Sequence, residues 1–355
     1  MKKALRNMTT GVLCVLLLSL ATACGQNGGN ATVPNSSGND TADVQDAQNE
    51  NTAKDLTKVS VVLDWTPNTN HTGLYVADAK GYYEEQGLDV DIILPGDAGA
   101  DAMIASGNAE FGISYQESIT QARVNGVPIV SIAAVIQHNT SGFASPAEKN
   151  IKSPKDFEGK VYGGGWNLPV EKAVIQSIME LEGADVNKVE FVTTGDGDFF
   201  TSTTEGGIDF AWIYYAWTGI EAELRDFPIN MIYVKDYTEK LDYYTPVIAT
   251  SEQLIEEQPE LAEKFMAATS KGYEFAIENP EEAAEILLEA VPELDRELVI
   301  ASQKWLSPRY QDDAPRWGEQ KEEVWRNYAD WMRENNLLEK ELDVENAFTN
   351  KFLPE

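Results

Sequence analysis

The side chains with the clearest chemistry stand in one short stretch of the sequence. They combine a carboxylate, an indole, two amides and an imidazole: Asp64, Trp65, Asn68, Asn70 and His71. An apolar, β-branched run precedes them at Val59–Leu63 and is typical of a buried parallel strand. A helix is predicted to follow at Gly73–Gln86. Because open α/β sheets bind ligands at the carboxyl ends of their strands, this loop is predicted to hold a flat polar molecule.

A second group of candidate binding residues surrounds a glycine-rich turn, Gly163–Gly165. Trp166 follows the turn, Pro169 suits the first turn of a helix, and Glu171 comes shortly after it. A carboxylate at this place can accept hydrogen bonds from an amino group and an adjacent protonated ring nitrogen of a flat polar ligand. The alternative is an acid that only interacts with the helix dipole. The glycines match neither phosphate-binding motif, GxxxxGK[ST] or GxGxxG, so a phosphate is disfavoured.

Other candidate residues follow the remaining predicted strands. They complete the predicted ligand-binding set: Tyr115, Glu117, Asn139, Asp198, Tyr214 and Tyr215. Trp212 and Trp217 extend the supply of aromatic rings at these strand ends. Core packing is the alternative for each single aromatic residue, but together they suit a cleft that stacks on a flat ring. Apolar and aromatic residues near the carboxyl terminus, among them Trp325, Tyr328 and Met332, have helical spacing and are predicted to be core.

No metal or other cofactor is expected from the sequence. The two histidines, His71 and His138, show no metal-ligand spacing. His71 is expected to orient or contact the ligand, and His138 to be an edge-of-cleft or structural residue. Asp196-Gly197-Asp198 resembles the start of a calcium loop, but Thr201 stands where the loop needs glycine.

The first loop and its surroundings resemble a known family. The segment Leu63–Gly73 reads L-D-W-T-P-N-T-N-H-T-G, and K-G-Y-Y and G-L-D-V follow at Lys80–Tyr83 and Gly87–Val90. This pattern resembles the solute-binding proteins of ABC importers that carry pyrimidine precursors of thiamine (ThiY-type). A-E-F-G-I-S at Ala109–Ser114 is similar to the second βαβ unit of the same fold. The resemblance covers about Val59 to Pro354.

The resemblance implies an α/β fold of two lobes, the type II periplasmic-binding-protein-like fold. Each lobe would be a mixed or parallel sheet flanked by helices, with the ligand cleft between the lobes. The chain is expected to divide into a lipoprotein signal peptide (1–23), a disordered tether (24–58), lobe 1 (59–145 and 247–355) and lobe 2 (146–246). The composition of the tether region, rich in Asn, Gly, Ser, Thr and Asp, supports its separation from the fold.

The predicted signal peptide at the amino terminus indicates where the protein acts. Positive residues precede an apolar run, Gly11–Ala23, that is too short to span a bilayer. Leu20–Cys24 resembles a lipoprotein cleavage box, with Cys24 as the lipidated residue, and an ordinary secretory signal is the alternative. The localisation expected is therefore the extracytoplasmic face of the cell membrane, with the membrane contacted only through the lipid anchor. A net charge of -32 argues against nucleic acid as a partner.

Two classes of function follow from the resemblance. The first is a monomeric binding protein that delivers a small aromatic heterocycle, such as a formylaminopyrimidine, to the permease of an ABC importer. Riboflavin or another flat heterocycle is the alternative ligand. The second class is an enzyme, since fungal pyrimidine synthases resemble this family and use iron and a cysteine-rich motif. Both cysteines of this chain, Cys14 and Cys24, lie in the leader, so we expect no enzymatic activity.

Overall fold

The computed structural model describes residues 56–195 and 197–355. The predicted signal peptide, the lipidation site Cys24 and nearly all of the predicted tether lie outside the described residues. So does Asp196 of the acidic turn. Within the described ranges, no helix combines the length and the apolar character needed to cross a membrane.

Two sheets of five strands organise the described chain. The first contains β1 (Thr57–Val62), β2 (Leu88–Ile93), β3 (Phe111–Ser114), β4 (Ile129–Ala134) and β10 (Val247–Ser251). The second contains β5 (Ser141–Pro146), β6 (Val161–Gly164), β7 (Glu190–Thr193), β8 (Phe210–Tyr214) and β9 (Ile229–Tyr233). We call the first sheet with its helices lobe 1 and the second sheet with its helices lobe 2. The limits of the lobes along the chain stay a prediction, and β5 begins slightly before the limit at 145/146.

Both sheets have the same arrangement of strands. Their orders are β2-β1-β3-β10-β4 and β7-β6-β8-β5-β9. In lobe 1, β10 runs antiparallel to β3 and β4, and in lobe 2, β5 runs antiparallel to β8 and β9. The pairs β1–β2, β1–β3, β6–β7 and β6–β8 are parallel. The antiparallel strand of each sheet is therefore the one by which the chain enters lobe 2 or returns to lobe 1.

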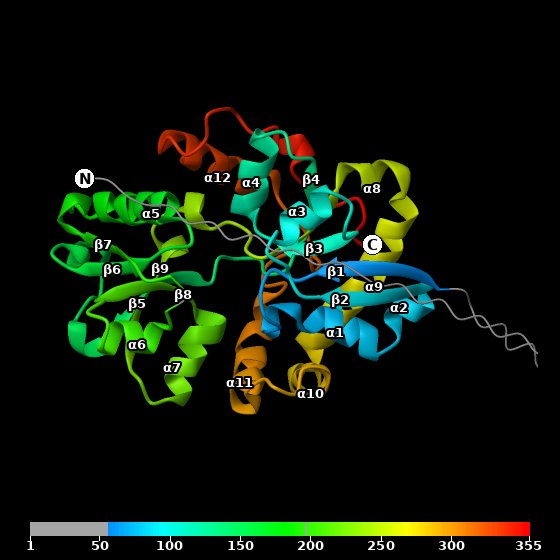
Figure 1. Cartoon of the computed structure of the whole chain (residues 1–355), viewed down its shortest axis with the longest axis horizontal. Coiled ribbons are helices and arrows are strands. Elements are labelled where there is room, and N and C mark those ends of the chain that lie inside the picture. Colours follow the sequence, from blue (N-terminus) through cyan, green and yellow to red (C-terminus); the bar gives the residue numbers. More distant parts are fainter. Residues whose placement is uncertain (1–55, 196) are drawn as a thin grey trace, which may run out of the picture. The chain divides into compact units, whose positions relative to one another are not determined.

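Helices cover both faces of each sheet (Figure 1). Those of lobe 1 are α1 (Thr72–Ala79), α2 (Tyr82–Glu85), α3 (Ala100–Ala105), α4 (Gln116–Val124), α8 (Glu252–Glu257), α9 (Pro259–Glu278), α10 (Pro280–Ala290) and α11 (Arg296–Leu306). Those of lobe 2 are α5 (Leu168–Leu181), α6 (Phe199–Thr204) and α7 (Ile220–Leu224). The last helix, α12 (Glu322–Glu334), contributes to the cores of both lobes.

The strands bury both of their faces, as their apolar sequences predict. Successive residues of β1 show this, because Val61 packs in a core with Phe265 of α9 while Val62 packs in a core with Ile104 of α3. In α12, Trp325 packs into the lobe 1 core, whereas Tyr328 and Met332 pack into the lobe 2 core. The prediction that these three residues are core is confirmed, since none is exposed.

One predicted helix differs from the structure, and one strand was not predicted. The single helix predicted at Gly73–Gln86 is two helices, α1 and α2, because Gly81 adopts a left-handed conformation (φ 73°) that interrupts it. The segment Ser141–Pro146 forms β5, and its small residues did not indicate a strand. Gly142 of β5 packs so closely that a Cβ atom there would lie 2.1 Å from the carbonyl oxygen of Ile232. This strand therefore needs small residues, and they hide the usual strand pattern.

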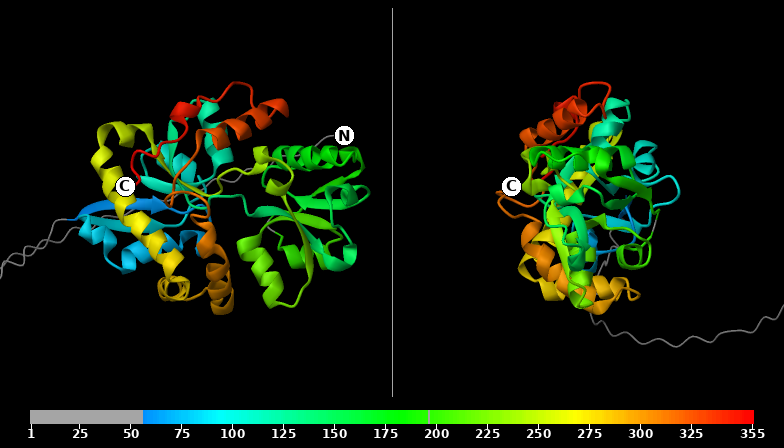
Figure 2. Two further views of the ribbon diagram at one scale, coloured as in Figure 1. Left: turned by 180° about the vertical axis from the view of Figure 1, so that it is seen from behind. Right: turned by 90° about the vertical axis from the view of Figure 1, so that its left-hand side faces the viewer.

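The helix that follows the first candidate loop, α1, packs closely on α9. Seen from behind, α9 crosses the first sheet (Figure 2). The contact has glycine on both sides, because a Cβ atom on Gly73 would lie 2.3 Å from the ring of Tyr273, and one on Gly272 would lie 2.0 Å from the carbonyl oxygen of Gly73. Tyr273 in turn donates a hydrogen bond of 2.7 Å from its hydroxyl to the carbonyl oxygen of Asn70. This hydrogen bond and the close packing of α9 on α1 hold the loop before α1 in place.

We predict that Gly272→Ala lowers the free energy of unfolding by about 1–3 kcal/mol, because the added methyl group overpacks the α1–α9 contact. Intrinsic helix propensity would act in the opposite direction, since alanine is favoured over glycine within a helix. Thermal melting measures the difference. The matched control is Gly96→Ala, where an added Cβ atom meets no atom within 4 Å. Equal melting temperatures for the two variants would contradict the close packing.

Candidate functional site

The loop after β1 is built around the carboxylate of Asp64, whose side chain is only 7% exposed. One carboxylate oxygen accepts a hydrogen bond of 2.6 Å from Nε2 of His71, and the other accepts one from the hydroxyl of Tyr115. Nδ1 of His71 accepts the backbone N–H of Asn68 at 3.2 Å, which places the imidazole proton on Nε2. Burial alone would raise the pKa of Asp64, but the attraction of His71 and the hydrogen bonds from His71 and Tyr115 hold it below its ordinary value.

The two asparagines of this loop have local roles. The side-chain oxygen of Asn68 accepts the backbone N–H of Asn70 at 2.9 Å, and its amide nitrogen donates to the carbonyl oxygen of Thr66 at 3.0 Å. Asn68 thus caps the short helical turn that contains His71. Trp65, by contrast, projects from the loop and is 56% exposed. The buried polar residues therefore hold the loop in its conformation, and the indole of Trp65 is the side chain that the loop exposes.

The glycine-rich turn of lobe 2 is built around a second carboxylate, Glu171, which is fully buried in the first turn of α5. It accepts hydrogen bonds from the hydroxyl of Tyr162 at 3.0 Å and from the backbone N–H groups of Gly165 at 3.2 Å and Asn167 at 3.0 Å. A Cβ atom on Gly164 would lie 1.9 Å from a Glu171 oxygen, so the turn needs glycine at this position. Trp166, in the middle of the turn, is 52% exposed.

The two exposed indoles line one cavity with a volume of about 570 Å³. Trp65 comes from lobe 1, and the remaining wall comes from the ends of β6 and β8 and from α6 and α7 of lobe 2. This volume is in the ordinary range for small-molecule sites, roughly 300–1,000 Å³. Of the predicted set, the cavity brings together Trp65, Trp166 and Asp198. Asp198 also caps α6, because its carboxylate accepts the backbone N–H groups of Phe200 and Thr201.

The cavity also contains residues that the sequence did not single out. They come from the segment around α6 and from α7: Thr194, Phe199, Phe200, Ser202, Thr218, Glu221 and Arg225. Arg225 lies over the ring of Phe200, 4.2 Å from its centre, and pairs with Glu221. The Phe199-Phe200 pair after the acidic turn was a signal that could have been used. Arg225 follows from no motif, since only the fold brings α7 beside α6.

The paired tyrosines at the end of β8 lie in different surroundings. Tyr214 is 37% exposed, and its pKa is raised first by burial of its hydroxyl and then by the carboxylates of Glu117, Asp64 and Glu171. It is therefore close to the acids of both lobes. Tyr215 instead packs against Trp305 of α11, with ring centres 5.2 Å apart. Its hydroxyl donates to Glu223 at 2.5 Å.

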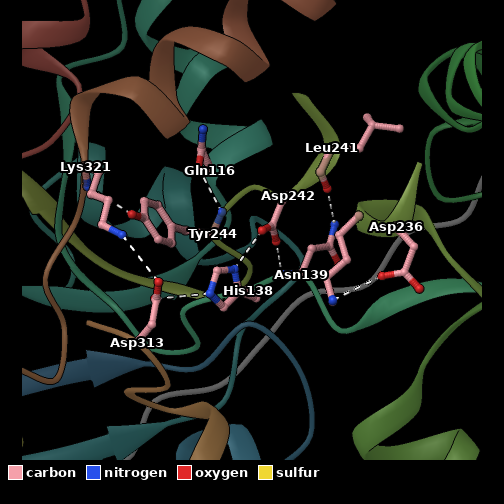
Figure 3. A network of polar contacts seen from close by, with 10 residues as sticks. Gln116, His138, Asn139, Asp236, Leu241, Asp242, Tyr244, Asp313 and Lys321 are labelled. Carbon is pink, nitrogen blue, oxygen red and sulfur yellow. Dashed lines mark hydrogen bonds and ion pairs between the residues drawn. The ribbon is translucent and has the colours of Figure 1, made fainter. Parts of the chain in front are cut away.

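Asn139 and His138 lie where the chain crosses between the lobes, together with the return crossing at Asp242–Pro246 (Figure 3). The backbone N–H of Asn139 donates to Asp242 at 2.9 Å, and its side-chain amide donates to the carbonyl oxygen of Leu241 at 3.1 Å. His138 contacts Asp242 through Nδ1 at 2.7 Å and Asp313 through Nε2 at 3.2 Å. The hydrogen bond with Asp242 is the main reason that the pKa of His138 is raised. These contacts join the two crossing segments to each other.

Glu117, in the first turn of α4, is 5% exposed, and its Oε2 atom is buried with no hydrogen-bond partner among the described residues. Burial raises its pKa to about 8, and the carboxylate of Asp101 adds to this, although a backbone hydrogen bond opposes it. Burial raises the pKa of Tyr243 and of Tyr328, and the charge of Glu117 raises both further. Glu117 therefore lies in a buried group of tyrosines beside the crossings.

The structure thus sorts the predicted residues into three groups. Trp65, Trp166 and Asp198 line the cavity. Asp64, Asn68, His71, Tyr115 and Glu171 form the polar supports of the two loops. Asn139, Glu117, Tyr214 and Tyr215 lie at or near the crossings. Direct contact of any of these residues with a ligand stays a prediction.

Two five-stranded lobes, each with one antiparallel crossing strand, and a cavity lined from both define the periplasmic-binding-protein fold. The described chain is similar to the periplasmic aliphatic sulphonate binding protein SsuA from Escherichia coli, with a TM-score of 0.64 and 13% identity over 82% of this chain and 91% of that one. The sequence matches the NMT1/THI5-like family over residues 68–283, and the chain belongs to that family.

Two characterised relatives are similar over most of the chain. The formylaminopyrimidine-binding protein of Halalkalibacterium halodurans is 31% identical over 315 residues, which is 84% of this chain and 93% of the relative. The riboflavin-binding protein RibY of Chloroflexus aurantiacus is 26% identical over 369 residues, which is 99% of this chain and 98% of the relative. The fold and the family resemblance expected from the sequence are therefore confirmed.

The raised pKa of Glu117 predicts a specific dependence of stability on pH. The folded protein holds this proton more tightly than the unfolded chain does, so the contribution to stability is complete below the ordinary pKa of 4.5 and is lost as the pH rises through about 8. Glu117→Gln keeps the shape of the neutral acid and cannot ionise. We expect the melting temperature to fall between pH 5 and pH 9 by at least about 2 °C less in this variant than in the wild type.

The control for this experiment is Glu256→Gln, which removes an exposed carboxyl group. Its melting temperature should follow that of the wild type at every pH. The melting temperature of Glu117→Gln could instead change with pH in parallel with that of the wild type. In that case Glu117 ionises in the folded protein without loss of stability, and the account of its burial is wrong.

Proposed function

We propose that this protein binds a pyrimidine precursor of thiamine, such as a formylaminopyrimidine, in the cavity lined by Trp65 and Trp166, and delivers it to an ABC importer. The observation that carries the proposal is the pair of exposed indoles, one from each lobe, on the wall of a single cavity. Both indoles are more than half exposed, although Trp166 also packs edge to face on Trp212. Stacking on an aromatic ring contributes roughly 0.5–1.5 kcal/mol beyond the area buried.

The choice of a pyrimidine rests on similarity and on the polar supports of the cavity. The formylaminopyrimidine-binding protein of Halalkalibacterium halodurans has the higher identity of the two relatives reported above. Asp64 supports the choice as well, because its pKa is held low and the side chain stays ionised. An ionised carboxylate beside the cleft suits a ligand with an amino group. We propose that Asp64, Tyr115 and Glu171 contribute to ligand binding by holding their loops in the binding conformation or by contacting the ligand directly.

Riboflavin or another flat heterocycle is a second candidate ligand, and two observations favour it. The riboflavin-binding protein RibY aligns with nearly the whole chain. The cavity also has polar groups beyond the indoles, among them Ser202, Thr218 and Arg225, that could bind the hydroxyl groups of a side chain. The proposed class of ligand is therefore a flat aromatic heterocycle, and the pyrimidine is the favoured member.

We propose a binding role without catalysis. The sequence has cysteine only at Cys14 and Cys24, so the folded part of the chain lacks the cysteine-rich motif of the fungal synthases. Both ring nitrogens of His71 also have protein partners, Asn68 at Nδ1 and Asp64 at Nε2. An imidazole held on both sides supports a loop better than it supplies a reactive nitrogen.

The proposed setting is the outer face of the cell membrane. The leader sequence supports a lipid anchor on Cys24, and the polar stretch up to residue 58 supports a tether to it. The proposed partners are the ligand and the permease of an importer, and we expect the protein to act as a monomer. Closure of the two lobes about the crossings at His138 and Asp242 would enclose the ligand.

The test is calorimetric titration of the purified protein with formylaminopyrimidine and, separately, with riboflavin. We expect a dissociation constant in the micromolar to nanomolar range for the pyrimidine, or roughly -8 to -12 kcal/mol. Trp65→Ala and Trp166→Ala should each weaken binding about tenfold, because each removes one stacking face. Leu181→Ala, which removes an exposed apolar side chain at the end of α5, is the control and should bind as the wild type does.

The two ligands separate the possible outcomes. Binding of riboflavin alone would keep the cavity and the role of the indoles but replace the ligand. Binding of the pyrimidine that is unaffected by both tryptophan variants would contradict the site. Failure of both ligands to bind would contradict the proposed function.

A further inference from the structure

His138 lies where the chain first crosses between the lobes, with a carboxyl group on each side of its ring. Its Nδ1 atom is 2.7 Å from an oxygen of Asp242, and its Nε2 atom is 3.2 Å from an oxygen of Asp313. An ionised carboxylate accepts hydrogen bonds but cannot donate them, so both ring nitrogens have to donate. Two N–H donors exist only in the protonated imidazole. The neutral ring has a single N–H, and its lone pair would face one of the two carboxylates.

The three residues of this group come from three separate segments of the chain (Figure 3). Asp242 belongs to the return crossing and also accepts the backbone N–H of Asn139, beside His138, at 2.9 Å. Asp313 lies in the loop between α11 and α12 and is 3.8 Å from Nζ of Lys321, the residue before α12. Since α12 contributes to the cores of both lobes, the protonated ring joins the two crossings to a helix that both lobes share.

The charges around His138 balance only when its ring is protonated. His138 lines a small cavity of about 320 Å³ whose other charged residues are Lys235, Asp236, Arg309 and Asp312. These four residues add no net charge, and Lys235 pairs with Asp236 at 3.2 Å. Tyr233, also in the wall, stays neutral because burial raises its pKa to about 12. The protonated ring and Lys321 therefore match the two carboxylates, whereas the neutral ring leaves one negative charge in excess.

We propose that His138 is a pH-sensitive switch at the crossings, whose protonated ring holds the lobes in the arrangement described here and so strengthens ligand binding. This inference rests on the proposed function and adds regulation by pH to it. The hydrogen bond with Asp242 raises the pKa of His138, and Asp313 raises it further, although burial opposes both. The contacts are therefore complete below the ordinary pKa of 6.5 and are lost as the pH rises through the higher value in the folded protein.

Ligand binding and protonation of His138 then strengthen each other. A ligand held between Trp65 and Trp166 favours the arrangement in which His138 has both contacts, and lobes that turn about the crossings change those contacts. By thermodynamic linkage, protonation tightens ligand binding by the same factor by which the ligand tightens proton binding at His138. We expect a factor of about three, because the side chains of His138 and Asp313 are 35% and 61% exposed and water competes for their contacts.

The test is calorimetric titration of the full chain between pH 5 and pH 9 with formylaminopyrimidine, or with riboflavin if that is the ligand bound. His138→Gln is neutral at every pH. Its dissociation constant divided by that of the wild type should fall from about three at pH 5 toward about one at pH 9. This ratio cancels the titration of the ligand and of other groups such as Glu117.

Two further variants separate the contact from a general effect of charge. Asp313→Asn removes one of the two acids beside the ring and should move the loss of affinity in the otherwise unchanged chain to lower pH. The matched control is Asp312→Asn, which makes the same change of charge at the neighbouring exposed residue. Asp312 lines the same cavity, but the contacts of the imidazole are with Asp242 and Asp313. This control should follow the wild type at every pH.

A spectroscopic measurement on the wild-type chain covers the case in which His138→Gln does not fold. The chain has two histidines, so the NMR titration of their ring protons is simple, and Asp313→Asn identifies His138 by the shift of its midpoint. The midpoint for His138 should lie above 6.5 in the free protein and rise further when the ligand is bound. It should fall in Asp313→Asn and stay unchanged in Asp312→Asn.

The results separate the two proposals. If the wild type binds the ligand but the ratio for His138→Gln is the same at every pH, the switch is overturned and the proposed function stands. A midpoint for His138 that the ligand leaves unchanged has the same meaning, and so do equal effects of Asp312→Asn and Asp313→Asn. If the wild type binds neither heterocycle at any pH in this range, the proposed function fails and this inference fails with it.

Discussion

The candidate site depends on two buried carboxylates, one in each lobe. Asp64 joins the loop after β1 to His71 and to Tyr115, and Glu171 joins the glycine-rich turn after β6 to Tyr162 and to backbone N–H groups. A buried charge is tolerated only when its hydrogen-bonding capacity is used, so each acid requires one conformation of its loop. In both lobes, the residue that this conformation leaves exposed is a tryptophan, Trp65 or Trp166. The ligand would meet indoles carried by loops that these hydrogen bonds hold in one conformation.

The crossings between the lobes contain a different kind of polar contact. The buried side chain of Asn139 donates to the carbonyl oxygen of Leu241, whereas His138 and Asp242 connect the outgoing and the returning segments through partly exposed side chains (Figure 3). Such contacts are weaker than the buried carboxylate networks, because water competes for the same groups. Rigid loops and more readily changed crossings suit a protein whose lobes move as units about a hinge. Glu117 belongs to neither group, since its carboxyl group is buried without a partner for Oε2.

The sequence predicted the fold well because the strands are buried on both faces and the loop motif is specific. It also pointed to the two loops whose exposed indoles line the cavity, because parallel strands end at one edge of a sheet. It did not distinguish a residue that presents a side chain from one that supports it. Asp64 and Trp65 are neighbours in the motif, yet one is buried and the other exposed, and only tertiary contacts such as that of Tyr115 decide which. Arg225 and the strand at Ser141–Pro146 were missed because close packing, rather than a local pattern, places them.

The most direct test of the central claim is a crystal structure of the protein with formylaminopyrimidine. The account predicts that the pyrimidine ring packs against the indoles of Trp65 and Trp166, with ring centres about 4.5–7 Å apart. It also predicts that Asp64 and Glu171 keep the hydrogen bonds to their own loops. A ligand bound away from both indoles would contradict the account. So would a ligand whose binding requires Asp64 to leave His71 and Tyr115, because the loop would then not be rigid.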